Sequence, residues 1–205
     1  MGIIPTSSRD MNDSIILTLY SQPQTVFTLD EISLYFPKVS YENLRSRIRY
    51  FTNVGKLQRL HQGIYAKIDY NPLELANKLY APSYISLETV LARGGVTFQY
   101  YETVFVVSYL TREVTLKDVN IQYRQIKRGV LTNLEGVFEK EGYFIASLER
   151  AFLDAVYIYK NYHFDNLSTI DWEKVDKLKK IYKSKAFEKR VEEYYQHYQE
   201  DFNVK

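Results

Sequence analysis

Residues Ser40 to Lys67 read SYENLRSRIRYFTNVGKLQRLHQGIYAK, and this stretch decides the fold of the first part of the chain. Its first half has the periodicity of an amphipathic helix, because Leu44, Ile48 and Phe51 recur at the i, i+4, i+7 spacing of one helix face. Ser40 is a favoured N-cap residue, and Gly55 suits the left-handed conformation that ends many helices. The sequence therefore predicts a helix that begins after Ser40 and ends before Gly55.

The opposite face of this helix is predicted to be polar and basic. At about 100° per residue, the side chains that fall on it or beside it are Glu42, Asn43, Arg45, Ser46, Arg49 and Asn53. Arg47 falls instead close to the apolar edge. Arginine pairs with guanine through two hydrogen bonds, asparagine pairs in the same way with adenine, and serine bonds to bases or phosphate. This face is therefore suited to the major groove of DNA.

A short basic hairpin follows the helix. Residues 57–60 and 64–67 are two strand-like runs, and His61-Gln62-Gly63 between them supplies a turn in which glycine permits a tight bend. His61 is either a contact to phosphate or the minor groove, or an exposed turn histidine. A helix suited to the major groove followed by a basic hairpin is the pattern of a winged helix-turn-helix domain.

Two helices are predicted before this stretch, as that domain requires. The first covers residues 12–20, and the second runs from Leu29 to Phe36 and ends at Pro37. Thr28 and Glu31 have the spacing of a capping box at the start of the second helix. The helix after Ser40 is then the third of the domain and the one that we expect to read DNA.

Basic residues are concentrated in the same region. Residues 38–67 contain seven basic residues and a single acidic one, Glu42, so the segment carries +6 while the whole chain carries +2. One strongly basic face on a balanced protein is typical of a protein that binds a polyanion. The residues predicted to contact double-stranded DNA are Ser40, Asn43, Arg45, Ser46, Arg49, Asn53, Lys56, Arg59, Gln62 and Lys67.

Three of these residues, Lys56, Arg59 and Lys67, are candidates for phosphate contacts, which position a protein without reading sequence. The alternative is a solvated basic helix in a winged-helix domain that binds a protein instead of DNA.

The rest of the chain alternates between helix-like and strand-like segments. Asp69-Tyr70-Asn71-Pro72 marks a boundary, so that residues 1–70 and 71–205 are predicted to be separate domains. Helices are expected at 73–80, 84–93, 145–159, 171–183 and 185–200, and strands at 104–107, 114–116 and 119–124. The sequence thus predicts an α+β protein, in which an N-terminal winged helix-turn-helix precedes a mixed α/β domain with terminal helices.

No catalytic or metal-binding constellation is visible. The chain has no cysteine, which excludes disulfides, thiolate chemistry and Cys-based zinc fingers. His163 and His197 are isolated, and Glu149 and Asp154 share a helix without a close common face, so we expect these two acids to be surface or capping carboxylates. We predict a protein that is not an enzyme and that uses no metal or cofactor. Because no long apolar run occurs, we also expect a cytoplasmic protein with no membrane partner.

A second basic cluster extends from Lys174 to Arg190. It has eight basic residues against Asp176 and Glu188. Such a run usually marks a solvated helix face, and the alternative is a contact with an acidic partner or an extension of the DNA footprint.

Three segments, in order, resemble the AbiEi-type antitoxin family of bacterial abortive-infection systems. Residues 55–66, GKLQRLHQGIYA, are similar to the wing of that family, where a Leu-x-Arg-Leu-x-x-Gly-x-Tyr signature is typical. APSYISLETVL at 81–91 resembles the motif that opens the family's second domain, and ASLERAFLD at 146–154 resembles a helix motif of that domain. The resemblance extends over roughly residues 12 to 160, and the remaining C-terminal residues are not part of it.

The resemblance implies a DNA-binding transcriptional repressor that acts as the antitoxin of a type IV toxin–antitoxin system. Its winged helix is expected to bind inverted repeats in its own promoter, and its second domain to antagonise a nucleotidyltransferase-like toxin, with direct binding of the toxin left open. Inverted repeats require two protomers on one operator, whether the chain is a monomer or a weak dimer in solution.

Three alternatives remain at this point. One is a winged-helix transcription factor with no toxin partner, whose second domain senses a ligand or binds a protein. Another is an enzyme that processes DNA, and the last is a protein-interaction module that binds no DNA.

Overall fold

The computed structural model describes residues 8–203, with side chains for residues 12–200. The chain is an α+β protein that divides into two compact units, Met1–Leu79 and Tyr80–Lys205. The sequence places the boundary after residue 70, whereas helix α4 (Pro72–Leu79) lies in the first unit, where it packs against strand β1 (Val26–Thr28). The side chain that accounts for this packing is Glu74.

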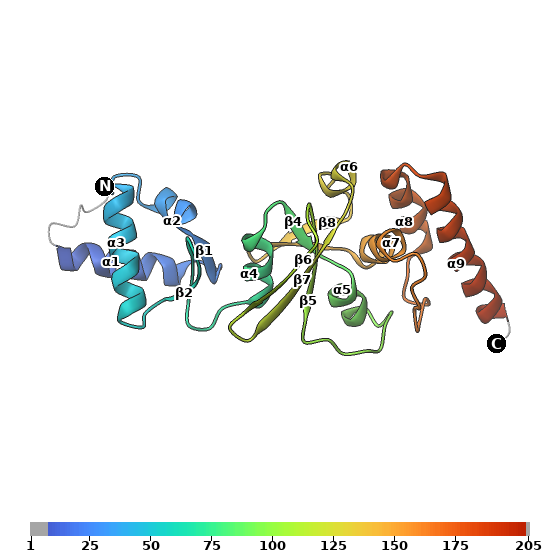
Figure 1. The fold of residues 1–205 in the computed structure, drawn as a ribbon, viewed down its shortest axis with the longest axis horizontal. Helices are drawn as coiled ribbons and strands as arrows, with labels where there is room; N and C mark the ends of the chain where they lie inside the picture. The colour runs from blue at the N-terminus through green and yellow to red at the C-terminus, as the bar shows by residue number, and fades with distance from the viewer. Residues whose placement is uncertain (1–7, 204–205) are drawn as a thin grey trace. The chain divides into compact units, whose positions relative to one another are not determined.

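In the first unit, three further helices accompany a small antiparallel sheet (Figure 1). The helices are α1 (Ser8–Ser21), α2 (Leu29–Tyr35) and α3 (Tyr41–Asn53). The sheet has the order β1-β3-β2, with β2 at Gln58–His61 and β3 at Ile64–Ala66. One apolar core joins these elements, and it includes Ile15, Leu19, Phe27, Ile32, Leu44, Ile48, Phe51 and Tyr65.

The predicted periodicity and caps of α3 are confirmed. Leu44, Ile48 and Phe51 are at most 1% exposed. The Ser40 hydroxyl accepts a hydrogen bond from the backbone N–H of Asn43, which satisfies one of the free donors at the start of the helix. At the other end Gly55 has a φ of +71°, a left-handed conformation that glycine adopts without steric cost. The local sequence alone therefore accounts for both ends of this helix.

Glu74 fastens α4 to β1. Its side chain is buried, and its carboxylate accepts hydrogen bonds from the backbone N–H groups of Thr25 and Val26, at 2.8 and 2.9 Å, and from the Thr25 hydroxyl at 2.8 Å. A buried carboxylate is tolerated only when its oxygens are hydrogen-bonded, and here they satisfy the backbone at the start of a strand. Because these hydrogen bonds join α4 to β1, the first unit extends to Leu79, beyond the predicted boundary after residue 70.

Glu74→Gln is expected to lower the free energy of unfolding of the first unit by about 1–3 kcal/mol, because the amide has one acceptor oxygen for donors that now share two. Hydrogen exchange at the Val26 amide measures this effect directly, and exchange should accelerate in the variant. Asp69→Asn is the control, since Asp69 is exposed in the same unit. Equal exchange rates in the two variants would contradict the role of Glu74 in stabilising the start of β1.

The second unit is built on a six-stranded mixed sheet of order β6-β7-β5-β4-β9-β8 (Figure 1). Its strands are β4 (Ser83–Ile85), β5 (Val104–Ser108), β6 (Arg112–Leu116), β7 (Val119–Gln125), β8 (Val137–Lys140) and β9 (Tyr143–Ala146). Strand β4 pairs antiparallel with β5 and parallel with β9, and β5 pairs parallel with β7. The predicted strands 104–107, 114–116 and 119–124 are confirmed as β5, β6 and β7.

Helices lie between these strands in the sequence and follow the last of them. They are α5 (Glu88–Arg93), α6 (Arg128–Leu131), α7 (Leu148–Ile158), α8 (Trp172–Leu178), the 3₁₀ turn η1 (Lys179–Tyr182) and α9 (Lys185–Asn203). Helix α7 packs against α5, α8 and α9, and Figure 1 shows α8 and α9 beyond α7 on the side away from the sheet. The two helices predicted at 171–183 and 185–200 correspond to α8 with η1 and to α9.

Two predicted helices are wrong in their first residues. The helix expected at 84–93 begins only at Glu88, because residues 83–85 form β4 in the middle of the sheet. The helix expected at 145–159 begins at Leu148, because residues 143–146 form β9. Both segments are short apolar runs beside a helix, and such runs do not distinguish a buried strand from a helix turn.

The expectation of surface carboxylates on α7 is also wrong. Glu149 is 7% exposed and Asp154 is fully buried. The carboxylate of Asp154 accepts hydrogen bonds from the hydroxyls of Tyr182 at 2.7 Å, Ser86 at 2.9 Å and Tyr84 at 3.2 Å. Complete burial raises the pKa of Asp154, and these hydroxyls and a neighbouring arginine act against the increase.

That arginine is Arg150, which is buried as completely as Asp154. Its Nε lies 3.4 Å from Asp154 Oδ1, and its remaining guanidinium nitrogens donate to the Tyr84 hydroxyl and to the carbonyls of Val130 and Glu135. The network therefore joins the segments 81–91 and 146–154, which are far apart in the sequence. Its role is structural, because the charged atoms are sealed from solvent and their hydrogen bonds are made within the protein.

Candidate nucleic-acid interface

A groove in the first unit lies between α3 and the β2–β3 hairpin. It has a volume of about 820 Å³. Its walls are formed by Tyr41, Glu42, Arg45, Ser46, Arg49, Thr52 and Asn53 of α3, by Arg59, Gln62, Gly63 and Tyr65 of the hairpin, and by Leu29 of α2. The apolar stripe of α3 faces the core, so the same helix necessarily turns its polar face to this groove.

Six of the ten residues predicted to contact DNA come together here: Arg45, Ser46, Arg49, Asn53, Arg59 and Gln62. All six are exposed. Helix and hairpin contribute to one surface because the register of β2 with β3 and the packing of Tyr65 on the core hold the hairpin beside α3. The sequence predicted these residues separately, and the tertiary structure makes them neighbours.

The other four predicted residues lie outside the groove. Ser40 caps α3 with its hydroxyl, and Asn43 and Lys56 are exposed on other parts of the surface. Lys67 has a different position from the one expected. Its ammonium donates to the backbone carbonyls of Gln22 at 2.6 Å and Tyr20 at 3.3 Å, at the C-terminal end of α1.

A cation is favourable at the end of a helix, where carbonyl groups lack partners. Burial lowers the pKa of Lys67, and its carbonyl partners account for a role in the fold. Lys67 is therefore left out of the interface proposed below.

The groove is basic. Its charged residues are Arg45, Arg49, Arg59 and Glu42. Within residues 12–200, no ion pair joins any of the three arginines to an acidic side chain. Their guanidinium groups therefore have donors available for an incoming ligand, and planar guanidinium groups bind phosphates and guanine edges through paired hydrogen bonds.

The prediction that Arg47 lies close to the apolar edge of α3 is confirmed. Arg47 is half-buried, and its guanidinium donates to the side-chain oxygen of Asn12 on α1. This contact holds α1 against α3 and turns Arg47 away from the basic groove.

Sequence reasoning did not select several residues that line the groove. Leu29 and Tyr65 are buried at its base, and Tyr41 and Thr52 are on its α3 wall. The Tyr41 hydroxyl donates to Asp30 at 3.1 Å, and partial desolvation together with this hydrogen bond raises the pKa of Tyr41. Tyr41 lies in the first turn of the helix, a position that also suits contact with a ligand.

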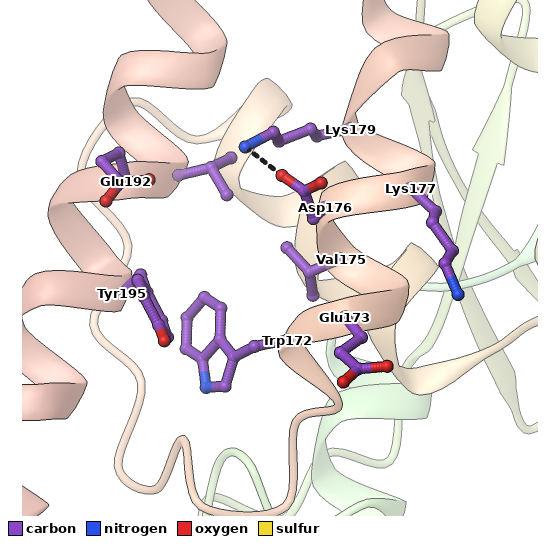
Figure 2. A pocket seen from close by; sticks show the side chains of 9 residues that line it. Trp172, Glu173, Val175, Asp176, Lys177, Lys179, Glu192 and Tyr195 are labelled. Atoms are coloured by element: carbon purple, nitrogen blue, oxygen red, sulfur yellow. Dashed lines mark ion pairs between the residues drawn. The ribbon is translucent and has the colours of Figure 1, made fainter.

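A second groove lies between α8 and α9 in the other unit (Figure 2). Its volume is about 430 Å³, and Trp172, Val175, Val191 and Tyr195 supply its apolar surface. Figure 2 shows the ion pair between Lys179 and Asp176, 2.6 Å long, at its edge. Its lining contains both acidic side chains (Glu173, Asp176, Glu192) and basic ones (Lys177, Lys179), so its charge favours no one class of ligand.

The basic cluster 174–190 is partly neutralised by the same helices. Lys174 pairs with Asp171 at 3.1 Å, and Lys189 lies 4.0 Å from Glu193. Exposed pairs of this kind contribute little to stability, but they reduce the positive potential of the surface. This pairing favours the solvated helix face over an extension of the DNA footprint.

The two histidines that the sequence shows as isolated, His163 and His197, line one pocket of about 530 Å³ together with Asp165 and Glu200. His163 and His197 are exposed, and each has its own acidic neighbour, Asp165 at 3.8 Å and Glu200 at 3.6 Å. Among the residues that the structure describes, no group of three or more His, Cys, Asp or Glu side chains is arranged to hold a metal ion. In the same part of the chain no helix has both the length and the apolarity needed to cross a membrane.

Neither the models of known protein families nor the curated proteins match this chain. The resemblance to AbiEi-type antitoxins therefore rests on the three sequence segments alone.

Proposed function

We propose that the first unit is a winged helix-turn-helix domain that binds double-stranded DNA. In this proposal α3 enters the major groove, and the β2–β3 hairpin is the wing that follows the phosphate backbone. The single observation that carries it is the basic groove, in which Arg45 and Arg49 of α3 and Arg59 of the hairpin line one surface, and within residues 12–200 no ion pair joins them to an acidic side chain. DNA supplies both the anionic backbone and the flat hydrogen-bonding base edges that such a surface binds.

The two walls of the groove have different expected tasks. Residues of α3 that follow one another at helical spacing, among them Arg45, Ser46, Arg49 and Asn53, are the candidates for base contacts. Arg59 and Gln62 belong to the hairpin and are candidates for phosphate contacts, which fix the position of the protein on the duplex. A major groove about 12 Å wide admits one helix.

For the whole chain we propose a transcriptional repressor that serves as the antitoxin of a type IV toxin–antitoxin system. Segments 81–91 and 146–154 support it through their resemblance to AbiEi-type antitoxins. The protein would act in the cytoplasm, bind inverted repeats upstream of its own operon as two copies, and antagonise a nucleotidyltransferase-like toxin encoded beside it. The genes beside this one test the proposal. A nucleotidyltransferase gene next to it would support an antitoxin, whereas the absence of such a gene would favour a winged-helix transcription factor without a toxin.

A gel-shift titration with the DNA upstream of the gene tests the first part of the proposal. The full chain should shift this duplex, and the logarithm of the binding constant should fall linearly as the logarithm of the salt concentration rises. A chain that leaves the duplex unshifted even at low salt would exclude DNA binding and favour a protein-interaction module. Hydrolysis of the duplex in the presence of Mg²⁺ would instead indicate an enzyme.

Arg59→Ala should weaken the binding of all duplexes to a similar degree, because a phosphate contact is independent of base sequence. Its salt dependence should be less steep than that of the unaltered chain by about one unit of slope. The measurement is the gel-shift titration repeated between low and physiological salt. Lys140→Ala removes one exposed positive charge from the second unit and should leave the slope unchanged.

A further inference from the structure

We propose that Glu42 reads a cytosine through the exocyclic N4 amine, and that this acidic side chain adds selectivity for cytosine to the basic groove. This inference rests on the proposed binding of DNA by α3. Because Glu42 is negatively charged, its repulsion from the DNA phosphates is unfavourable for binding unless the side chain contacts a base. Glu42 lies in the first turn of α3 and lines the same groove as Arg45 and Arg49.

Glu42 belongs to one continuous stripe of the helix. Arg45, Ser46 and Arg49 follow it at three, four and seven residues, the spacings that bring side chains to one helix face. Its side chain is exposed, and within residues 12–200 no ion pair to a basic side chain occupies it. The carboxylate is therefore available to whatever the stripe contacts.

A carboxylate in this position is unfavourable against most of a duplex. Phosphates repel it, and it accepts hydrogen bonds but donates none. In the major groove, guanine offers two acceptors and thymine offers an acceptor and a methyl group, whereas cytosine offers the N4 amine as a donor. Adenine has one donor beside an acceptor, which faces the second carboxylate oxygen. Cytosine is therefore the base whose major-groove edge suits Glu42 best.

The spacing along α3 predicts where this cytosine lies relative to the guanines. A helix rises about 1.5 Å per residue, so Glu42 and Arg45 are about 4.5 Å apart along the axis, and Glu42 and Arg49 about 10.5 Å. Base pairs are stacked about 3.4 Å apart. If α3 follows the groove, the cytosine lies about one base pair from the guanine read by Arg45 and about three from the guanine read by Arg49.

A purely structural role for Glu42 predicts a different result. An acidic residue in the first turn of a helix also stabilises the helix through its dipole. Loss of that interaction changes stability, but it does not change which base is preferred at one position of the DNA. Base preference is therefore the measurement that distinguishes the two roles.

The experiment is a selection of binding sites from a pool of random-sequence duplexes at physiological salt. The full chain is compared with Glu42→Gln and with Asp69→Asn, which removes an exposed acidic charge of the same unit outside the groove. The unaltered chain and Asp69→Asn should select the same half-site, with a cytosine beside a guanine. Glutamine pairs with adenine through two hydrogen bonds, so Glu42→Gln should select adenine in place of that cytosine and keep the guanines.

Affinities for defined duplexes complete the test. Changing the selected cytosine to thymine should weaken binding of the unaltered chain by about 10- to 100-fold and should have little effect on Glu42→Gln. The variant should also bind duplexes without the site more tightly than the unaltered chain, since a repulsive charge is gone.

The outcomes separate this inference from the function on which it rests. If the unaltered chain and Glu42→Gln select the same bases, the inference is overturned while DNA binding stands. If the unaltered chain enriches no sequence and shifts no duplex, DNA binding itself fails. Selection of a site without cytosine by the unaltered chain also overturns the role given to Glu42.

Discussion

Replacing both Arg45 and Arg49 by alanine is expected to lower the affinity of the full chain for its upstream DNA by about 30-fold or more at physiological salt. Each arginine that pairs with a guanine contributes about 1–3 kcal/mol of discrimination, and about 1.4 kcal/mol corresponds to a tenfold change in affinity. Both side chains are exposed on the polar face of α3, so their removal leaves the buried stripe of the helix intact. Gel-shift titration of the purified variant measures the effect.

A charge-matched control separates local contacts from net charge. Arg93→Ala with Lys140→Ala also removes two exposed positive charges, but from the second unit. This control should retain most of the affinity. An unchanged affinity in the Arg45 and Arg49 double variant at physiological salt would show that α3 is not the DNA-reading helix, and equal losses in both double variants would indicate a general electrostatic attraction.

Arg150→Met is expected to lower the free energy of unfolding of the second unit by about 3–5 kcal/mol. Asp154 would remain as an uncompensated buried charge, and the carbonyls of Val130 and Glu135 would lose their donor. Urea unfolding followed by tryptophan fluorescence measures this loss. Trp172 is the single tryptophan of the chain, and its ring contacts Phe152, which lies between Arg150 and Asp154 on α7.

Two further variants test whether the ion pair itself is responsible. Arg93→Met removes an exposed arginine from α5 and should change the unfolding free energy by no more than about 0.5 kcal/mol. Arg150→Met combined with Asp154→Leu should be less destabilised than the sum of the two single variants, because no lone charge stays buried. Additive losses, or a loss in Arg150→Met no larger than in Arg93→Met, would contradict the assignment.

Much of the first unit could be predicted from the sequence because its signals are local. The apolar spacing of Leu44, Ile48 and Phe51, the cap at Ser40 and the left-handed glycine at Gly55 each act within a few residues. The polar face of α3 follows from the same periodicity, and for that reason four of the predicted contact residues, Arg45, Ser46, Arg49 and Asn53, line one groove. What they bind stays a prediction, because a basic face alone does not identify its ligand.

The errors occur where long-range contacts override local preference. Tyr84 and Ile85 look helical beside the following helix, but their segment is placed between two strands that come from residues 104–108 and 143–146. Asp154 looks like a surface carboxylate until Arg150 and three hydroxyls from distant segments surround it. Strand pairing and buried networks of this kind have no signature at short spacing.

By itself the sequence determined the α+β class, the start and end of α3, and which of its faces is buried, because helix periodicity and capping are properties of neighbouring residues. Only the tertiary structure decided that Arg59 and Gln62 share a groove with Arg45 and Arg49. It also decided that the Lys67 ammonium donates to a backbone carbonyl at the C-terminal end of α1. These placements depend on how the hairpin and helices pack on one core. That packing brings together residues which the linear order keeps apart.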